Sequence, residues 1–361
     1  MKTILVLNIG SSSIKYDVYV HEKKVLGGYL ERVTDFEKGI KSVISELDKK
    51  KLKVDAIGHR VVHGGTHSES KLLDDKMVNE LDKISELAPL HNVPEVKGIR
   101  VCKKLFGVPM VAVFDTAFHA TIPDRAATYA IPLQLAKKHM IKRYGFHGTS
   151  HKYVAHETAK RLGKHLDDLK LITCHIGNGA SVCAINHGVS VDTSMGFTPL
   201  EGLVMGTRCG DMDPAIVEYL QKKEKLGPAE VDTLLNKKSG LLGLCGTNDM
   251  RDVHKRKSKD DKAHLAFEVY CYRLIKYIGA YTAAMNGVDA IVWTAGVGEH
   301  AYYVRERVMS HFGYLGVKMD LTKNKKNATV VSAAGSKVKV MVVPTNEQLM
   351  MVREVRKVLK G

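Results

Sequence analysis

Two arginines in this sequence each stand in a glycine-flanked segment, a setting that suits a side chain gripping an anion. One is Arg60, in G-H-R-V-V-H-G-G (residues 58–65), and the other is Arg208, in G-T-R-C-G (residues 206–210). A planar guanidinium can bind a carboxylate or a phosphate through two parallel hydrogen bonds, which lysine cannot do. A surface arginine at a turn would look the same in isolation. The prediction of an anion site therefore depends on what else the chain offers.

Two further residues have types that phosphoryl transfer uses. Asp115 directly follows the apolar run 108–114, where a carboxylate can hold Mg²⁺ or orient an attacking oxygen, although capping a helix N-terminus is a competing use. His147, in R-Y-G-F-H-G-T-S-H, precedes an expected helix and can donate to transferring phosphoryl oxygens. His151 is interpreted as structural, because the pair does not share a helical face and lacks the glutamate of H-E-x-x-H. We interpret His59 and His63 as structural too.

Three apolar runs lead directly into turns of small residues, at 8–11, 175–179 and 294–298. Glycines let the backbone approach phosphate closely, and exposed N–H groups form anion-binding nests. The first turn, in N-I-G-S-S-S-I-K-Y, adds hydroxyls and a cation that suit a phosphate chain and its Mg²⁺. Neither G-x-x-x-x-G-K-[ST] nor G-x-G-x-x-G occurs in the sequence. One such turn is weak evidence, but three in one chain predict a nucleotide held between two related halves.

The elements that must position these residues follow from the spacing of apolar side chains. A length of 361 residues suggests two domains, and α/β folds present ligand-binding residues at the carboxyl ends of their strands. The expected strands are 3–8 and 14–20 as a hairpin, 54–62, 108–114, 169–176, a pair around 186–188, 289–294 and 338–343. The expected helices are 35–50, 75–87, 94–106, 214–224, 262–285 and 348–359.

Composition argues against several classes of function. The net charge of +16 comes from short Lys-rich runs that are mixed with acids and lack interleaved aromatic residues, so nucleic acid is not an expected partner. Six scattered cysteines without a C-x-x-C pair predict buried free thiols rather than disulfides or a zinc site. No run approaches the roughly 18 apolar residues of a membrane span, and the apolar run Ile4–Leu7 is too short for a signal peptide. We therefore expect a cytoplasmic protein.

Taken together, these segments resemble the acetokinase family, whose motifs follow one another here over nearly the whole chain. They are N-x-G-S-S-S-x-K-Y, G-H-R-V-V-H-G-G, A-P-L-H-N, F-D-T-A-F-H, R-Y-G-F-H-G-T-S-H, H-I-G-N-G, D-T-S-M-G-F-T-P-L-E-G-L-x-M-G-T-R, D-M-R-D, T-A-G-V-G-E and T-N-E. The run from Asp192 to Arg208 is the most specific. The resemblance implies an α/β fold of two ribonuclease-H-like (actin-like ATPase) domains with a central cleft. Residues 1–114 plus 350–361 would form one domain and 115–349 the other, in a homodimer.

The resemblance also implies an activity and a role for each matching residue. The activity is reversible, Mg²⁺-dependent transfer of the ATP γ-phosphoryl group to acetate by direct in-line attack, with Mn²⁺ as a possible substitute. Arg60 and Arg208 would clamp acetate and the phosphoryl group, Asp115 would orient acetate or metal, and His147 would stabilise the transition state. Asn8 and Glu347 would hold the metal, and Val62, Leu90, Phe146 and Pro199 would surround the acetate methyl. The ATP site would be lined by Ser11, Ser13, Lys15, His175, Ile176, Gly177, Asn178, Gly179, Asp249, Met250, Arg251, Gly296, Val297, Gly298, Glu299 and His300.

Three departures from the family pattern leave alternatives open. The segment between Lys15 and Arg60 is shorter than usual, which implies that strands on the outer side of the first domain are missing. His300 stands where Asn is usual and Asn248 where Ser is usual, so ATP, GTP and pyrophosphate remain candidate donors. Propionate and butyrate remain candidate acceptors. A nucleotide-driven switch protein of the same fold would need a partner-binding domain, for which this chain leaves no room.

Overall fold

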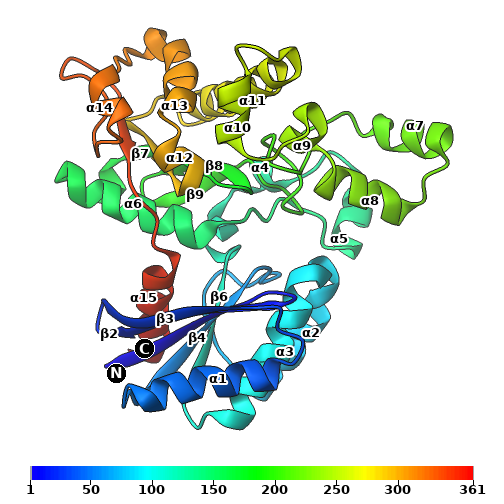
Figure 1. Cartoon of the computed structure of the whole chain (residues 1–361), viewed down its shortest axis with the longest axis vertical. Coiled ribbons are helices and arrows are strands. Elements are labelled where there is room, and N and C mark those ends of the chain that lie inside the picture. The colour runs from blue at the N-terminus through cyan, green and yellow to red at the C-terminus, as the bar shows by residue number, and fades with distance from the viewer. Residues whose placement is uncertain (1, 361) are drawn as a thin grey trace. The chain divides into compact units, whose positions relative to one another are not determined.

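The computed structural model describes residues 2–360, and the chain forms two compact units, each built on one sheet (Figure 1). Unit 1 comprises Met1–Ala120, His147–Tyr153 and Asn346–Gly361, and unit 2 comprises Thr121–Phe146 and Val154–Thr345. The short segment 147–153 belongs to unit 1 because the Gly148 N–H donates to the Asp115 carbonyl at 2.9 Å. A Cβ at Gly148 would lie 2.2 Å from that oxygen, so only glycine allows this approach.

The sheet of unit 1 has the strand order β3-β2-β1-β4-β6-β5. The first three strands form an antiparallel meander, β4 and β6 continue the sheet in parallel with β1, and β5 pairs antiparallel at the edge. Parallel strands covered on both faces are expected to be continuously apolar, as β1 and β6 are. The strands are β1 Thr3–Ile9, β2 Ser13–Val20, β3 Lys23–Glu31, β4 Ala56–Val61, β5 Lys71–Leu72 and β6 Met110–Phe114.

Helices cover both faces of this sheet, and the alternation of β1 shows how (Figure 1). Leu5 and Leu7 pack into a core shared with the helices α1 to α3, while Ile4 and Val6 pack against the last helix, α15, on the opposite face. Asp35 is the N-cap of α1: its carboxylate accepts hydrogen bonds from the backbone N–H groups of Glu37 and Lys38. The helical elements are α1 Phe36–Lys49, α2 Asp75–Ile84, a 3₁₀ turn Ser85–Leu87, α3 Pro89–Leu105, a 3₁₀ turn Ala117–Thr121 and α15 Glu347–Lys360.

The sheet of unit 2 has a similar arrangement of strands, in the order β11-β10-β7-β8-β9. β7, β8 and β9 form an antiparallel meander, and β10 and β11 continue in parallel with β7. The strands are β7 Lys170–Ile176, β8 Ala180–Asn186, β9 Val189–Thr193, β10 Ala290–Thr294 and β11 Lys339–Val342. The helices are α4 Asp124–Ala127, α5 Leu133–Lys138, α6 Gly148–Leu162 (which starts in unit 1), α7 Ala215–Glu224, α8 Pro228–Lys237, α9 Gly240–Cys245, α10 Met250–Arg256, α11 Asp261–Ala284, α12 Ala295–His300, α13 Tyr302–Met309 and α14 Leu321–Lys325, with 3₁₀ turns at Leu166–Asp168 and Ser310–Leu315.

The predicted α/β class is confirmed and every predicted strand and helix is present, but β3, β5, α4, α5, α8–α10 and α12–α14 were not predicted, and the predicted start of α3 was wrong. The third strand of the meander, β3, was not predicted, because this edge strand is largely solvent-exposed and contains Gly27 and Gly28. Helix α3 begins at Pro89 rather than near residue 94. Pro89 occupies the first turn, where proline is favoured, and Pro94 lies inside the helix.

The thiols and helices of the described residues also bear on the composition argument. All six cysteines are free, and five of them are buried, while Cys209 is half-buried, so the prediction of free thiols is confirmed. Within residues 2–360 no helix combines the length and the apolar character that a membrane span requires.

The buried His59 of β4 predicts an acid-sensitive unit 1. It is 2% exposed, and burial lowers its pKa from 6.5 to about 3. Below pH 6.5 His59 becomes protonated in the unfolded chain but stays neutral in the folded chain. The free energy of unfolding is therefore highest at neutral pH and falls as the pH decreases towards 3. At pH 5 the loss from this group is about 2 kcal/mol.

We expect the variant His59→Gln to lose less stability than the wild type between pH 7 and pH 5. Hydrogen exchange of β1 and β4 peptides is the suitable measurement, because the single tryptophan, Trp293, lies in β10 of unit 2. The exposed His21→Gln variant is the control and should follow the wild type. Equal pH dependence in all three proteins would contradict the assignment.

Candidate active site

The strand ends of unit 1 place a group of polar side chains on one face of the sheet. Asn8 of β1 lies opposite Lys15 of β2, so both side chains leave the sheet on the same side. Arg60 lies near the end of β4, beside β1, and its Nη1 is 3.4 Å from the Asn8 Oδ1. Arg60 also pairs with Val113, two residues before Asp115, which puts Asp115 on that face.

Arg60 and Asp115 form a tight two-pronged ion pair. The Arg60 Nη2 lies 2.5 Å from the Asp115 Oδ2, and Nε lies 3.1 Å from the same oxygen. Asp115 is 1% exposed, and the Thr149 hydroxyl donates to its other oxygen at 3.4 Å. Burial opposes the charge of Arg60, but the neighbouring carboxylates, Asp115 first, raise its pKa above its ordinary value. The guanidinium is therefore fixed in place and always charged.

Glu347, the first residue of α15, adds a second carboxylate to the same cluster. Burial raises the pKa of Glu347, and Asp115 raises it further, whereas the charges of Arg60 and Lys15 lower it. Among residues 2–360 no three His, Cys, Asp or Glu side chains converge as a metal site. Mg²⁺ in phosphoryl-transfer enzymes is commonly held by one or two carboxylates, with phosphate oxygens and waters completing the shell. The carboxylate of Glu347 and the amide oxygen of Asn8 suit such an ion.

The predicted residues of the acetate pocket and the histidine fall in different units. Val62 is buried at 4% exposure beside Arg60 in unit 1, and Leu90 lies in α3, where its side chain is outside the described part of the structure. His147 belongs to unit 1, immediately before α6, and has a left-handed backbone with φ of 57°. Phe146 and Pro199 belong to unit 2.

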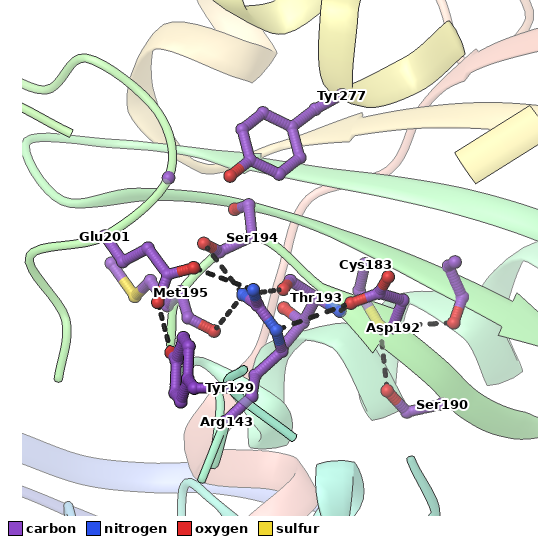
Figure 2. A network of polar contacts seen from close by, with 12 residues as sticks. Tyr129, Arg143, Cys183, Ser190, Asp192, Thr193, Ser194, Met195, Glu201 and Tyr277 are labelled. Carbon is purple, nitrogen blue, oxygen red and sulfur yellow. Dashed lines mark hydrogen bonds and ion pairs between the residues drawn. The ribbon is translucent and has the colours of Figure 1, made fainter. Parts of the chain in front are cut away.

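In unit 2 the loop between β9 and α7 is held by one partly buried arginine, Arg143 (Figure 2). Its Nη1 donates to the carbonyl of Thr193 at 2.8 Å and its Nη2 to the carboxylate of Glu201 at 2.7 Å. Asp192 lies 3.7 Å from its Nε, and Tyr129 donates its hydroxyl proton to Glu201. Two neighbouring backbone N–H groups, of residues 144 and 145, donate to the Gly196 carbonyl. The segment before Phe146 is thus tied to the loop that contains Pro199.

The same loop carries Arg208, whose Nη1 donates to the Pro199 carbonyl at 3.3 Å. Burial lowers the pKa of Arg208, and no carboxylate partner is recorded for it among the described residues. Gly202 has φ of 105°, and a Cβ there would lie 2.3 Å from the Ser194 carbonyl. The loop therefore needs glycine at this point to place Arg208 and Pro199 together, and it leaves Arg208 without the ion pair that Arg60 has.

Unit 2 also contains a cavity of about 530 Å³ at the ends of β7 and β10. The two strands lie side by side, with Thr294 opposite His175, so the glycine turn after β7 and helix α12 after β10 meet there. Eight of the predicted ATP residues line it: Gly177, Asn178, Asp249, Met250, Arg251, Gly296, Val297 and His300. The other lining residues are Gly206, Leu241, Asn248, Tyr270, Ala301 and Tyr303.

Tyr303 lines this cavity and was not among the residues predicted from the sequence. Its ring stacks on His254 with centroids 3.5 Å apart, its hydroxyl donates to the Met250 carbonyl at 3.2 Å, and burial raises its pKa to about 12. Asp249 caps α10 and pairs with Arg251, whose hydrogen bonds lower the pKa of Asp249 to about 2. Only the helical pattern around α13 could have indicated Tyr303, since no sequence motif marks it.

The remaining predicted ATP residues lie outside the lining. Ile176 and Gly298 are buried, and Ser11, Ser13 and Lys15 belong to the β1–β2 hairpin of unit 1. His175 is the penultimate residue of β7, and Gly179 lies in the turn that follows this strand. Glu299 turns back to accept the N–H of Ala295 at 2.9 Å and that of Thr345 at 3.4 Å.

Helix α12 is held in place from behind by Arg305, a fully buried side chain of α13. Arg305 donates to the carbonyls of Gly298 and Glu299 at 2.7 and 3.1 Å, and its other bonds go to Asn324 and Asn327. Because these partners are neutral, burial lowers its pKa to about 10.

Comparison with known proteins identifies the family to which these two sites belong. The model of the acetokinase family matches residues 28–353. The chain belongs to the acetokinase family. This acetokinase-family chain is 48% identical to the acetate kinase of Halothermothrix orenii, over 99% of this chain and all of that protein. It is 49% identical to the acetate kinase of Thermotoga maritima, over 99% of this chain and 98% of that protein.

Solved structures of the acetokinase family confirm the fold. The acetate kinase of Porphyromonas gingivalis superposes with a TM-score of 0.95 at 38% identity, covering 99% of this chain and all of the other. A propionate kinase from Francisella tularensis gives 0.92 at 40% identity, covering 98% and 99%. The predicted two-sheet, actin-like ATPase fold is therefore confirmed.

The Arg143 network predicts a large effect from a residue outside the substrate-binding set. The variant Arg143→Gln should destabilise unit 2 by about 2–3 kcal/mol, because it removes charge-assisted hydrogen bonds to Glu201 and to backbone carbonyls and leaves the partly buried Glu201 and Asp192 without their cation. Urea unfolding followed by Trp293 fluorescence measures this unit directly. Arg307→Gln removes the more exposed pair with Glu268 and should cost about 1 kcal/mol or less. Equal losses in the two variants would contradict the role given to the network.

Proposed function

We propose that this protein is an acetate kinase that transfers the γ-phosphoryl group of ATP reversibly to acetate, giving acetyl phosphate and ADP. The observation that carries the proposal is the Arg60–Asp115 pair at the strand ends of an acetokinase-family chain. The pair offers a fixed, permanently charged guanidinium beside the buried side chain of Val62. A small anion with one methyl group matches that combination of charge and apolar surface.

The chemistry asks for positioning and charge neutralisation rather than for a base. Acetate is already ionised at neutral pH, so it needs no proton removed before it attacks phosphorus. Arg60 and Arg208 would bind the acceptor carboxylate and the equatorial phosphoryl oxygens, with Asp115 holding Arg60 in orientation. His147 would donate to the developing negative charge, which is where preorganised donors contribute most. We propose direct in-line transfer, with inversion at phosphorus.

A divalent ion completes the charge balance of this proposal. Bound Mg²⁺ neutralises phosphate charge and aligns the phosphate chain. Asn8 and Glu347 would hold it, the second through water, and Lys15 with the hydroxyls of Ser11 and Ser13 would contact the phosphates. Mn²⁺ is the expected substitute, because it also accepts oxygen ligands.

The cavity of unit 2 would hold the nucleoside part of the donor. Its size suits a nucleoside, and its lining combines backbone at the glycine turns with the ring of Tyr303. ATP is the proposed donor. His300 and Asn248 line the cavity at positions where the family usually has other residues, so they are the residues to examine if GTP is also used.

We also infer the surroundings of the enzyme from its family. A homodimer in the cytoplasm is the proposal, with the two sequence-defined domains (1–114 plus 350–361, and 115–349) acting together on one substrate pair. Size-exclusion chromatography with light scattering tests the dimer.

An acetyl-hydroxamate assay tests the proposed function. Acetate, propionate and butyrate are compared as acceptors, and ATP, GTP and pyrophosphate as donors, with Mg²⁺, Mn²⁺ or a chelator. The highest kcat/KM is expected for acetate with ATP and Mg²⁺. Some propionate turnover is expected, because one methylene group changes binding by only about 1–3 kcal/mol. A higher kcat/KM for propionate or butyrate, or no turnover of acetate, would overturn the proposal.

The two arginines should be individually essential. Arg60→Ala and Arg208→Ala are each expected to lower kcat/KM for acetate on the order of 10³-fold or more, as loss of an arginine at a transferring phosphoryl group does. Asp115→Ala should be similarly severe, because Arg60 loses the partner that orients it. Arg100→Ala and Arg307→Ala, which remove an exposed arginine of unit 1 and a partly exposed arginine of unit 2, are the controls. Rates close to wild type in both Arg60→Ala and Arg208→Ala would refute their assignment.

A further inference from the structure

A buried glutamate, Glu95, lies behind the proposed acetate site and has no role in the mechanism above. It is on α3 and only 2% exposed, in a stretch whose neighbours Val96 and Ile99 are fully packed core residues. Glutamate is almost never this buried without a partner, because removing its charge from water is costly. Glu95 therefore needs a structural explanation.

The contacts of Glu95 show that α3 holds the chain just after β4. The Glu95 Oε2 accepts the N–H of Val62 at 3.0 Å. One turn earlier, Asn92 accepts the N–H of His63 at 3.1 Å and donates to the His63 carbonyl at 2.8 Å. Residues three apart on a helix lie on one face, so the two side chains hold two successive residues. The segment they fix starts two residues after Arg60.

Charge links Glu95 to the Arg60–Asp115 pair as well. Burial raises the pKa of Glu95 to about 8, the charge of Arg60 acts to lower it, and the charge of Asp115 raises it. Arg60, near the end of β4, and Asp115, after β6, are the charged groups whose interactions shift the pKa of Glu95. The side chains that α1 and α2 pack towards α3 are apolar, among them Ile40, Val43, Met77 and Leu81. Burial therefore favours the neutral form of Glu95, and the neutral carboxyl group can still accept the Val62 hydrogen bond through its oxygen.

We propose that Glu95 is a positioning residue of the acceptor site: it fixes Val62 through its backbone N–H, and its charge state sets how strongly Arg60 attracts the acceptor carboxylate. This rests on the proposed function, in which Arg60 and Val62 bind acetate. While Glu95 is neutral, the positive charge of Arg60 interacts mainly with Asp115 and with the acceptor carboxylate. Once ionised, it is a further anion near Arg60, and it opposes the binding of acetate. The KM for acetate should therefore rise with pH, while kcat changes little.

The variant Glu95→Gln tests this, because the amide oxygen keeps the Val62 hydrogen bond and the side chain cannot ionise. Between about pH 7 and about pH 9, the wild-type KM for acetate is expected to increase several-fold, up to about tenfold, as for one pKa unit of coupling. In Glu95→Gln this increase should be absent. The control is Glu354→Gln in α15, which loses contacts to Lys152 and Ser70 and should keep the wild-type profile. Parallel KM profiles for wild type and Glu95→Gln would overturn the inference.

A direct titration separates failure of this inference from failure of the proposed function. In protein labelled with ¹³C at glutamate carboxyl groups, the Glu95 signal is the one missing from Glu95→Gln. Linkage is reciprocal, so acetate that binds less tightly to the ionised form must raise the pKa of Glu95. A shift on adding acetate supports the inference even if phosphoryl transfer to acetate is not detected. A Glu95 titration that acetate leaves unchanged overturns it, whatever the activity.

Discussion

The structure of unit 1 depends on one ion pair, between Arg60 and Asp115. Asp115 is buried and Arg60 is partly buried. A buried carboxylate is tolerated only when a cation and hydrogen-bond donors compensate its charge, so breaking the pair from one side leaves an uncompensated charge. Both residues stand at strand ends, so the parallel register of β4 and β6 sets their distance. The glycine at position 148 and the hydroxyl of Thr149 then fix Asp115 from the other side. Loop, helix start and sheet therefore converge on this pair.

The two units share one strand topology but carry different groups at the ends of their central strands. In each, an antiparallel meander is followed by two parallel strands, and polar residues gather where the central strands end. Unit 1 puts charged side chains there, whereas unit 2 puts glycine-rich backbone and a cavity there. In unit 2 the site arginine, Arg208, lies on an irregular loop instead of a strand, and that loop is held by the partly buried network around Arg143 (Figure 2). An arginine without a carboxylate partner remains available to an incoming anion.

Sequence reasoning predicted most of the strands, most of the longer helices and Arg60 with Asp115, because apolar periodicity and a carboxylate after a buried strand are local signals, whereas the short helices of unit 2 carry too few apolar repeats to show one. β3 escaped because an exposed edge strand with two glycines lacks that periodicity. Glu95 escaped for a different reason. A glutamate within an amphipathic helix is normally placed on the solvent side, and only the packing of α3 against β4 reveals that this one faces inward. Tyr303 and Arg143 likewise depend on contacts between segments distant in sequence. Their roles come from tertiary structure, which local patterns do not contain.

The presence of carboxylates in a site for anions has a physical reason. Interactions that hold substrate and transition state equally well lower KM without raising kcat. A pocket built only of cations would bind acetate and phosphate strongly in the ground state and gain little as charge shifts between oxygens. Asp115 and Glu347 offset part of the positive charge of Arg60 and Lys15. The donors of the site are nonetheless fixed in direction by buried hydrogen bonds. The benefit is then concentrated in the transition state, where negative charge on the phosphoryl oxygens and the bridging groups meets donors that need no reorganisation.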